Sequence, residues 1–139
     1  MKVLKDLLEA IGSRLLSETD VKVVRLYNED GEDPKLTPAV DVEFTPFEWR
    51  EEGRESRSAT LTVILHCHAA SYEMPTMNAA GIDTQTPELD LVQAVDQALH
   101  NWKALPAGTP LRVTAVAPDS AFGMSRDWRL SATLTVNNC

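Results

Sequence analysis

The chain has little cysteine, no excess of basic residues and no long apolar run. It contains two cysteines, Cys67 and Cys139, without the spacing of a C-x-x-C motif. Acids outnumber bases and give a formal net charge of -8. This charge argues against sequence-independent binding to nucleic acid and against binding to an anionic membrane. No segment approaches membrane-spanning length, and the charged N-terminus lacks the apolar centre of a signal peptide. We therefore expect a protein of a reducing cytoplasm, in which Cys67 is a small buried hydrophobe.

Motifs for catalysis and cofactor binding are missing as well. The sequence has no G-x-S-x-G nucleophile elbow and no glycine-rich phosphate cradle. The acids on either side of Gly31 lack the alternate ligand positions and distal glutamate of a calcium loop, so a solvated acidic turn is the better interpretation. We expect neither enzymatic activity nor a cofactor.

What the sequence does contain is a periodic pattern of apolar residues. Spacings of three and four over residues 2–16 and 87–103 predict two amphipathic helices. The second helix has Thr86 as N-cap and Pro87 at its first position, and its apolar stripe ends at Trp102. Alternating and β-branched runs predict strands over 21–26, 39–44, 59–69, 111–118 and 128–136.

The predicted order of elements is α-β-β-β-α-β-β. It favours an α+β fold, a two-layer sandwich with two helices on one face of a mainly antiparallel sheet of about five strands. No internal repeat or linker divides the chain, so residues 1–139 are predicted to form a single domain.

The longest predicted strand carries two histidines. His66 and His68 point to one face of a strand, and Cys67 points to the other. Two imidazoles on one face can share a metal ion, but the sequence defines no third ligand. A polar strand end is the favoured interpretation, and a metal-dependent enzyme centred on His66 and His68 is the less favoured one.

Two long connections are the candidates for contacts with partners. The loop 45–58 places two aromatics among charges of both signs, and aromatics and arginines anchor many interfaces. Its aromatics either serve an interface or fold back to cap the core, and both alternatives remain open. The loop 70–86 is long enough to suggest a functional role. The interface candidates are Phe47, Trp49, Arg50, Arg54, Arg57, Tyr72, Met74 and Met77.

The order of elements and the apolar pattern resemble one known family. The segments that carry the resemblance are Leu7-Leu8-Glu9-Ala10-Ile11, Val21–Val24, residues 38–42 and 60–67, Ala94-Val95-x-x-Ala98-Leu99, and Asp127-Trp128-Arg129-Leu130. In these features the chain resembles the tail terminator, or tail completion, proteins that join head and tail in long-tailed bacteriophages and prophages.

This resemblance implies a small α+β protomer that forms a ring, usually a hexamer, on the end of the tail tube. The ring stops tube polymerisation and provides the surface that docks the filled head. The implied partners are further copies of the chain, the tail tube protein and the head-tail connector protein, and DNA only passes through the lumen. The implied location is the host cytoplasm during assembly and then the virion tail. The alternative is a small protein-binding module or assembly chaperone that uses an exposed aromatic loop.

Overall fold

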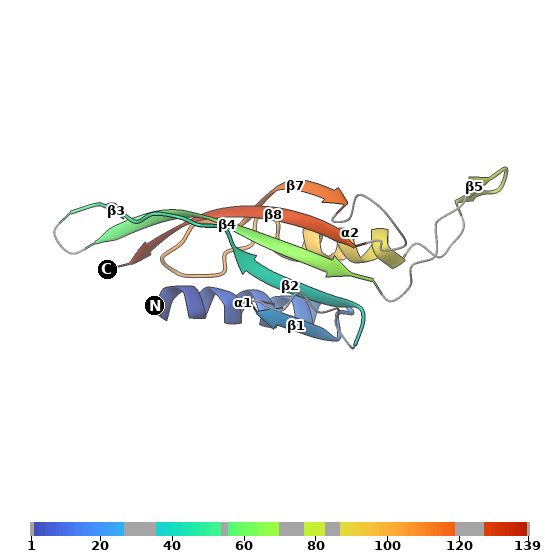
Figure 1. Ribbon diagram of the computed structural model, residues 1–139, viewed down its shortest axis with the longest axis horizontal. Coiled ribbons are helices and arrows are strands. Elements are labelled where there is room, and N and C mark those ends of the chain that lie inside the picture. The colour runs from blue at the N-terminus through green and yellow to red at the C-terminus, as the bar shows by residue number, and fades with distance from the viewer. Residues whose placement is uncertain are drawn as a thin grey trace.

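The computed structural model describes residues 2–26, 36–53, 56–69, 77–82, 87–118 and 127–138. Its two helices are α1 (Lys2–Glu18) and α2 (Pro87–Leu99). The main sheet contains β1 (Val23–Leu26), β2 (Ala39–Phe44), β3 (Arg50–Glu51), β4 (Arg57–His68), β7 (Arg112–Pro118) and β8 (Trp128–Asn138). A separate hairpin is formed by β5 (Met77–Asn78) and β6 (Gly81–Ile82), and it lies away from the sheet at one end of the molecule (Figure 1).

The sheet is built around β4, its longest strand. Its strands follow the order β1-β2-β4-β8-β7, and β3 also pairs with β4. Only the pair β1–β2 is parallel, and every other pair is antiparallel. Because β8 pairs with β4 over residues 57–67, β2 and β3 must share the other edge of β4. The predicted mainly antiparallel sheet is confirmed, with β3 as an additional short strand.

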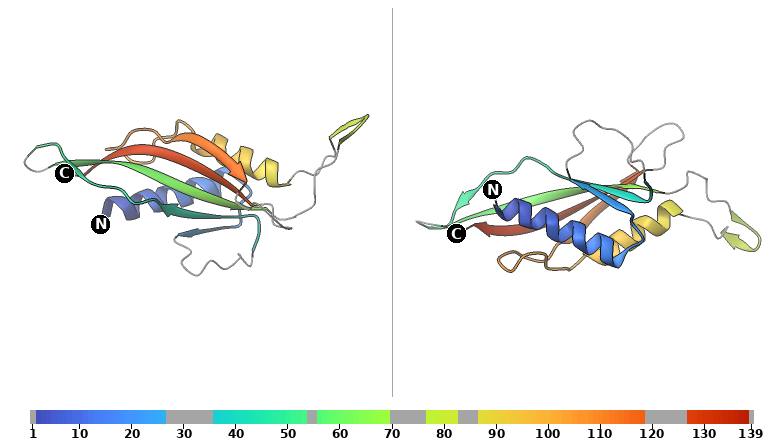
Figure 2. Two further views of the ribbon diagram at one scale, coloured as in Figure 1. Left: turned by 45° about the horizontal axis from the view of Figure 1, so that its top comes forward. Right: turned by 90° about the horizontal axis from the view of Figure 1, so that it is seen from below.

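Both helices cover the same face of the sheet (Figure 2). Side chains alternate along β4 and β8, so every second residue points toward the helices and is buried. The predicted apolar stripes of both helices pack on these residues in one core. Its largest fully buried side chains are Leu7, Ile11, Leu15, Val40, Val42, Leu61, Val63, Leu65, Val95, Leu99, Leu111 and Leu130. The two-layer α+β architecture is thereby confirmed.

The predicted end of the second helix is wrong. The helix ends at Leu99 and not at residue 103, because Asn101 adopts a left-handed conformation with φ of 61°. Asparagine tolerates this conformation better than most residues, and it is common just after a helix C-terminus. The N–H of Trp102 then donates to the carbonyl of Leu99 (3.1 Å). Trp102 therefore lies beyond the helix, where it packs half-buried against the core.

The loop expected over residues 45–58 contains β3 and the first residues of β4. Together with the end of β8 they extend beyond the first turn of α1 (Figures 1 and 2). Other boundaries differ by one to two residues: α1 continues to Glu18, β1 begins at Val23, β4 begins at Arg57 and β8 continues to Asn138. Neither helix of the described chain combines the length and apolar character needed to cross a bilayer.

Candidate functional site: the outer face and the edges of the sheet

The predicted histidine pair lies on the outer face of the sheet, which is the face opposite the helices. His66 and His68 both point to this face, and Cys67 points into the core. The two histidines have different surroundings. His66 contacts Glu43, whose side chain is largely exposed, through Nε2 and Oε1 at 3.0 Å. His68 is only 8% exposed and belongs to a buried charge network.

The network joins four charged side chains from four segments. Arg25 of β1 donates from Nε and Nη2 to the two carboxylate oxygens of Asp41 on β2, each at 2.6 Å. His68 lies between two carboxylates, with Nε2 3.0 Å from Oδ2 of Asp41 and Nδ1 3.0 Å from Oδ2 of Asp127. A carboxylate only accepts hydrogen bonds, so both contacts are satisfied when both ring nitrogens carry a proton. The imidazolium form balances two positive charges against two negative ones.

The pKa values of the network follow from this arrangement. Burial opposes the charged form of His68, but the neighbouring Asp127 and Asp41 outweigh it and raise the pKa of His68 above its usual value. Burial also opposes the charged form of Asp41, yet the Arg25 guanidinium and His68 hold the pKa of Asp41 below its usual value. The network therefore links β1, β2, β4 and the residue that precedes β8 through acidic and basic side chains.

The metal-site hypothesis gains no support from this geometry. Both ring nitrogens of His68 face carboxylates, and an imidazolium has no lone pair for a metal. Within the described ranges, no group of three or more histidine, cysteine or acidic side chains is placed to hold a metal ion. When both of its ring nitrogens carry a proton, His68 can link the side chains of Asp41 and Asp127.

The aromatic pair of the loop folds back onto the core. Phe47 and Trp49 contact each other edge to face, with ring centroids 5.7 Å apart, and both pack half-buried against the core. The guanidinium of Arg57 lies 5.0 Å from the centroid of the Trp49 ring. Both rings therefore pack against the core, as the capping alternative predicts, and their role in an interface stays a prediction.

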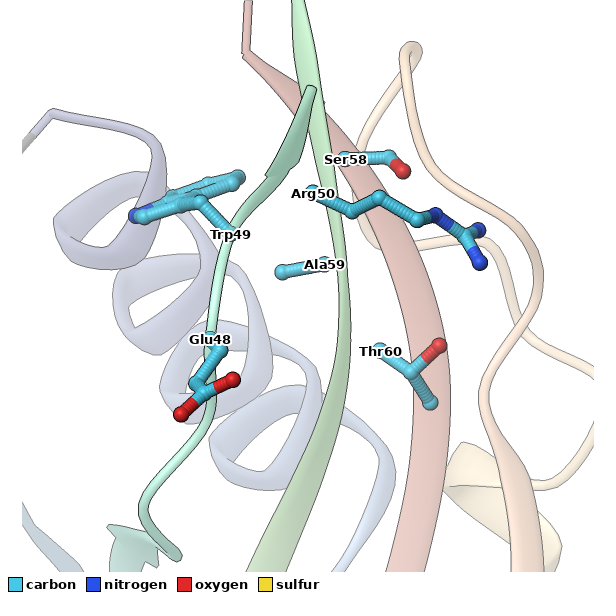
Figure 3. Close-up of a pocket in the computed structure, with 6 residues that line it drawn as sticks. All are labelled: Glu48, Trp49, Arg50, Ser58, Ala59 and Thr60. Atoms are coloured by element: carbon cyan, nitrogen blue, oxygen red, sulfur yellow. The ribbon is translucent and has the colours of Figure 1, made fainter. Parts of the chain in front are cut away.

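A cavity of about 420 Å³ lies between residues 48–50 and β4. Figure 3 shows Arg50, Ser58 and Thr60 on one side of the strands and Trp49 on the other. Arg50 is 76% exposed and donates from Nε to Oε1 of Glu52 at 3.1 Å, and Ser58 donates to the same carboxylate oxygen at 2.8 Å. Arg50 and Glu52 therefore already form an ion pair within the protomer.

Four predicted interface residues remain: Arg54, Tyr72, Met74 and Met77. Arg54, Tyr72 and Met74 lie outside the described residues. The backbone of Met77 belongs to β5, in the hairpin away from the sheet. Their role in an interface stays a prediction.

A second groove, of about 360 Å³, lies across the opposite edge of the sheet. We call it the Arg112 groove, and sequence reasoning missed it. It forms because residues 108–110 continue the line of β7 along β8: the N–H of Thr109 donates to the carbonyl of Thr135 (2.9 Å), and the N–H of Thr135 donates to Oγ1 of Thr109 (2.9 Å). The lining residues are Thr60, Asn101, Thr109, Pro110, Arg112, Thr133, Leu134 and Thr135.

The free edge of β7 is closed to strand addition at its start and interrupted further along. Leu111 exchanges backbone hydrogen bonds with Asn101 (2.7 Å) and Trp102 (2.8 Å). The N–H of Val113 donates to Nδ1 of His100 (3.1 Å), and a bulge follows between Val113 and Ala115. The strand ends at Pro118, which has no N–H. These features are the usual protection of an exposed sheet edge.

Apolar side chains are nevertheless exposed on both edge strands. Leu26 of β1 is 42% exposed and Val116 of β7 is 46% exposed. The two strands lie at opposite ends of the sheet order, so the protomer presents two different edges with an apolar side chain on each.

Comparison with models of known protein families gives no match for this chain, and comparison with curated proteins gives no match either.

Proposed function

We propose that this chain is a structural tail terminator of a long-tailed phage or prophage. It forms a ring on the end of the tail tube, stops tube polymerisation and provides the surface that docks the head. The observation that carries this proposal is the pair of unlike sheet edges, one with Leu26 and the other with Val116. A closed ring is built from a heterologous contact, in which each protomer uses two different patches.

The architecture supports the same role. The helices and one face of the sheet form a complete core, so the outer face, the edges and the projecting end of the sheet remain for contacts with other subunits. The formal net charge of -8 suits a lumen that repels DNA and lets it slide. Further copies of the chain, the tail tube protein and the head-tail connector are the proposed partners, with six protomers as the number that the resemblance favours.

Electron microscopy of tail tubes tests this function. The tail tube protein encoded in the same genome is polymerised with and without this chain, and tube lengths and end caps are measured. We expect shorter tubes of more uniform length, each with a ring at one end. Tubes of unchanged length without end caps contradict the proposal. A protein that binds a single partner one to one and never forms rings favours the binding-module alternative.

A further inference from the structure

The Arg112 groove is a basic site on an acidic protein. The chain has 21 acidic and 13 basic residues, yet none of the described residues that line this groove is an acid. Arg112 is exposed and has no ion pair or side-chain hydrogen bond within the described chain. The carboxamide of Asn101 and the threonine hydroxyls add neutral hydrogen-bonding groups around the guanidinium. Such a site is suited to a carboxylate, which a guanidinium binds with two parallel hydrogen bonds.

Two unpaired acids lie on the opposite edge of the sheet. Glu48 and Glu51, which we call the β3 edge acids, are exposed, and among the described residues neither has an ion pair or hydrogen bond. Their basic neighbours are already engaged, because Arg50 contacts Glu52 and Arg57 lies over the Trp49 ring. This edge therefore has two carboxylates that its own protomer does not neutralise.

The topology separates these two features by the width of the sheet. At this level the sheet consists of β3, β4, β8 and the segment 108–110, so β3 and the groove lie on opposite edges. Three strand spacings of about 4.8 Å each separate them, and among the described residues no ion pair or hydrogen bond joins these acids to Arg112 of the same protomer. Complementary patches on opposite edges suit a head-to-tail contact between copies.

We propose that the Arg112 groove of one protomer binds the β3 edge acids of the next, and this inference rests on the proposed ring. The contact is made by side chains, because His100, Asn101 and Trp102 already occupy the backbone edge beside the groove. The occupant is a second copy of this chain, and the chemistry it supplies is a pair of carboxylates. Charge complementarity of this kind fixes which patches meet and in which register.

Charge reversal tests the contact. Arg112→Glu and the double variant Glu48→Lys/Glu51→Lys each turn attraction into repulsion, and we expect the apparent Kd of self-association to rise at least about tenfold in each. The triple variant with all three changes restores opposite charges and is expected to return within about threefold of the wild type. Sedimentation velocity measures the association in solution, and electron microscopy counts capped tubes. The matched control is Arg129→Glu, an exposed arginine of β8 that does not line the groove.

The outcomes separate this inference from the proposed function. If Arg112→Glu and the double variant form rings as the wild type does, the groove contact is wrong while the ring stands. If single changes weaken association and the triple variant does not recover, the pairing of these residues is wrong. If the wild type neither forms rings nor caps tubes, the proposed function fails and the contact fails with it. Urea denaturation of every variant checks that the fold is intact.

Discussion

Nδ1 of His68 lies 3.0 Å from Oδ2 of Asp127, and this contact fastens the residue before β8 to the end of the central strand. The other oxygen of Asp127 is buried without a hydrogen-bond partner in the described structure, so the carboxylate depends on His68 for its neutralising charge. On its other side the imidazole meets Asp41, which Arg25 also holds. Both contacts of His68 are therefore hydrogen bonds only when both ring nitrogens carry a proton.

Stability is expected to fall as the pH rises through the raised pKa of His68. Because the pKa of His68 is raised in the folded state, its contribution is fully present below the unfolded-state pKa of about 6.5 and is lost as the pH rises through the raised value. Urea denaturation between pH 6 and pH 9 measures this change, and His68→Gln should remove it. A wild-type profile as flat as that of the variant contradicts the prediction.

The contribution of Asp41 to stability depends on pH with the opposite sign. Since the pKa of Asp41 is lowered, its contribution is present above 3.8 and is lost as the pH falls through the depressed folded-state value. Asp41→Asn removes the charge at similar size and leaves the Arg25 guanidinium and the imidazolium without their shared partner. We expect a loss of roughly 3 kcal/mol in the free energy of unfolding.

The control for this substitution is Glu43→Gln on the same strand and the same face. Glu43 is exposed and pairs with His66 at the surface, so its loss should cost less than about 1 kcal/mol. Urea denaturation at pH 7 measures the free energy of unfolding of both variants. Equal losses would show that burial of the network does not add to its contribution to stability.

Two of the three half-buried tryptophans, Trp49 and Trp102, are expected to contribute to stability. Trp49→Ala and Trp102→Ala each remove a ring that packs against the core, at roughly 2–3 kcal/mol, less than the full cost of emptying a buried site. Arg57→Gln removes only the cation over Trp49 and should cost less than about 1 kcal/mol. Chemical denaturation distinguishes these cases, and an unchanged Trp49→Ala would return that side chain to the list of surface anchors.

The helix end at Asn101 gives a prediction about backbone conformation. Asn101→Gly removes the side-chain strain of a φ of 61° and should leave stability unchanged or slightly raised. Asn101→Ala keeps the strain without the favourable asparagine and is expected to cost about 1 kcal/mol. If thermal denaturation ranks alanine equal to glycine, the left-handed conformation is not what ends α2.

Substitutions on the two edges test the ring directly. Leu26→Arg and Val116→Arg each spoil one edge and should prevent ring closure while leaving the core intact. Mixed in equal amounts, the two variants retain one matched pair of edges and are expected to stop at dimers in mass photometry. Leu16→Arg, an exposed leucine of α1, is the control. Complete rings from either edge variant alone would contradict the use of these edges.

Periodicity was sufficient to predict most of the fold, because both helices and five strands carry regular apolar spacing. It could not predict β3, since two exposed residues, Arg50 and Glu51, have no period of their own. The end of α2 was misplaced because the apolar stripe continues to Trp102, while Asn101 decides the backbone. A left-handed asparagine is a local signal that periodicity ignores.

The charge network was only half visible in the sequence. Asp41 lies between two valines of β2, and strand alternation puts it on the face of His68 once their strands pair. The partner Arg25 depends on the parallel pairing of β1 with β2, and Asp127 depends on the position of β8 beside β4. Neither pairing can be deduced from a single chain. The Arg112 groove was invisible for the same reason.

The obstructed edge of β7 has a consequence for the polymerisation of this chain. An open strand edge is a template that accepts another copy, and then another, without limit. In this chain His100, Asn101 and Trp102 occupy the start of this edge, and Pro118, which has no N–H, ends it. Association through side chains at fixed angles can close on itself and then stop. A subunit whose proposed task is to end a polymer would thus be prevented from starting one.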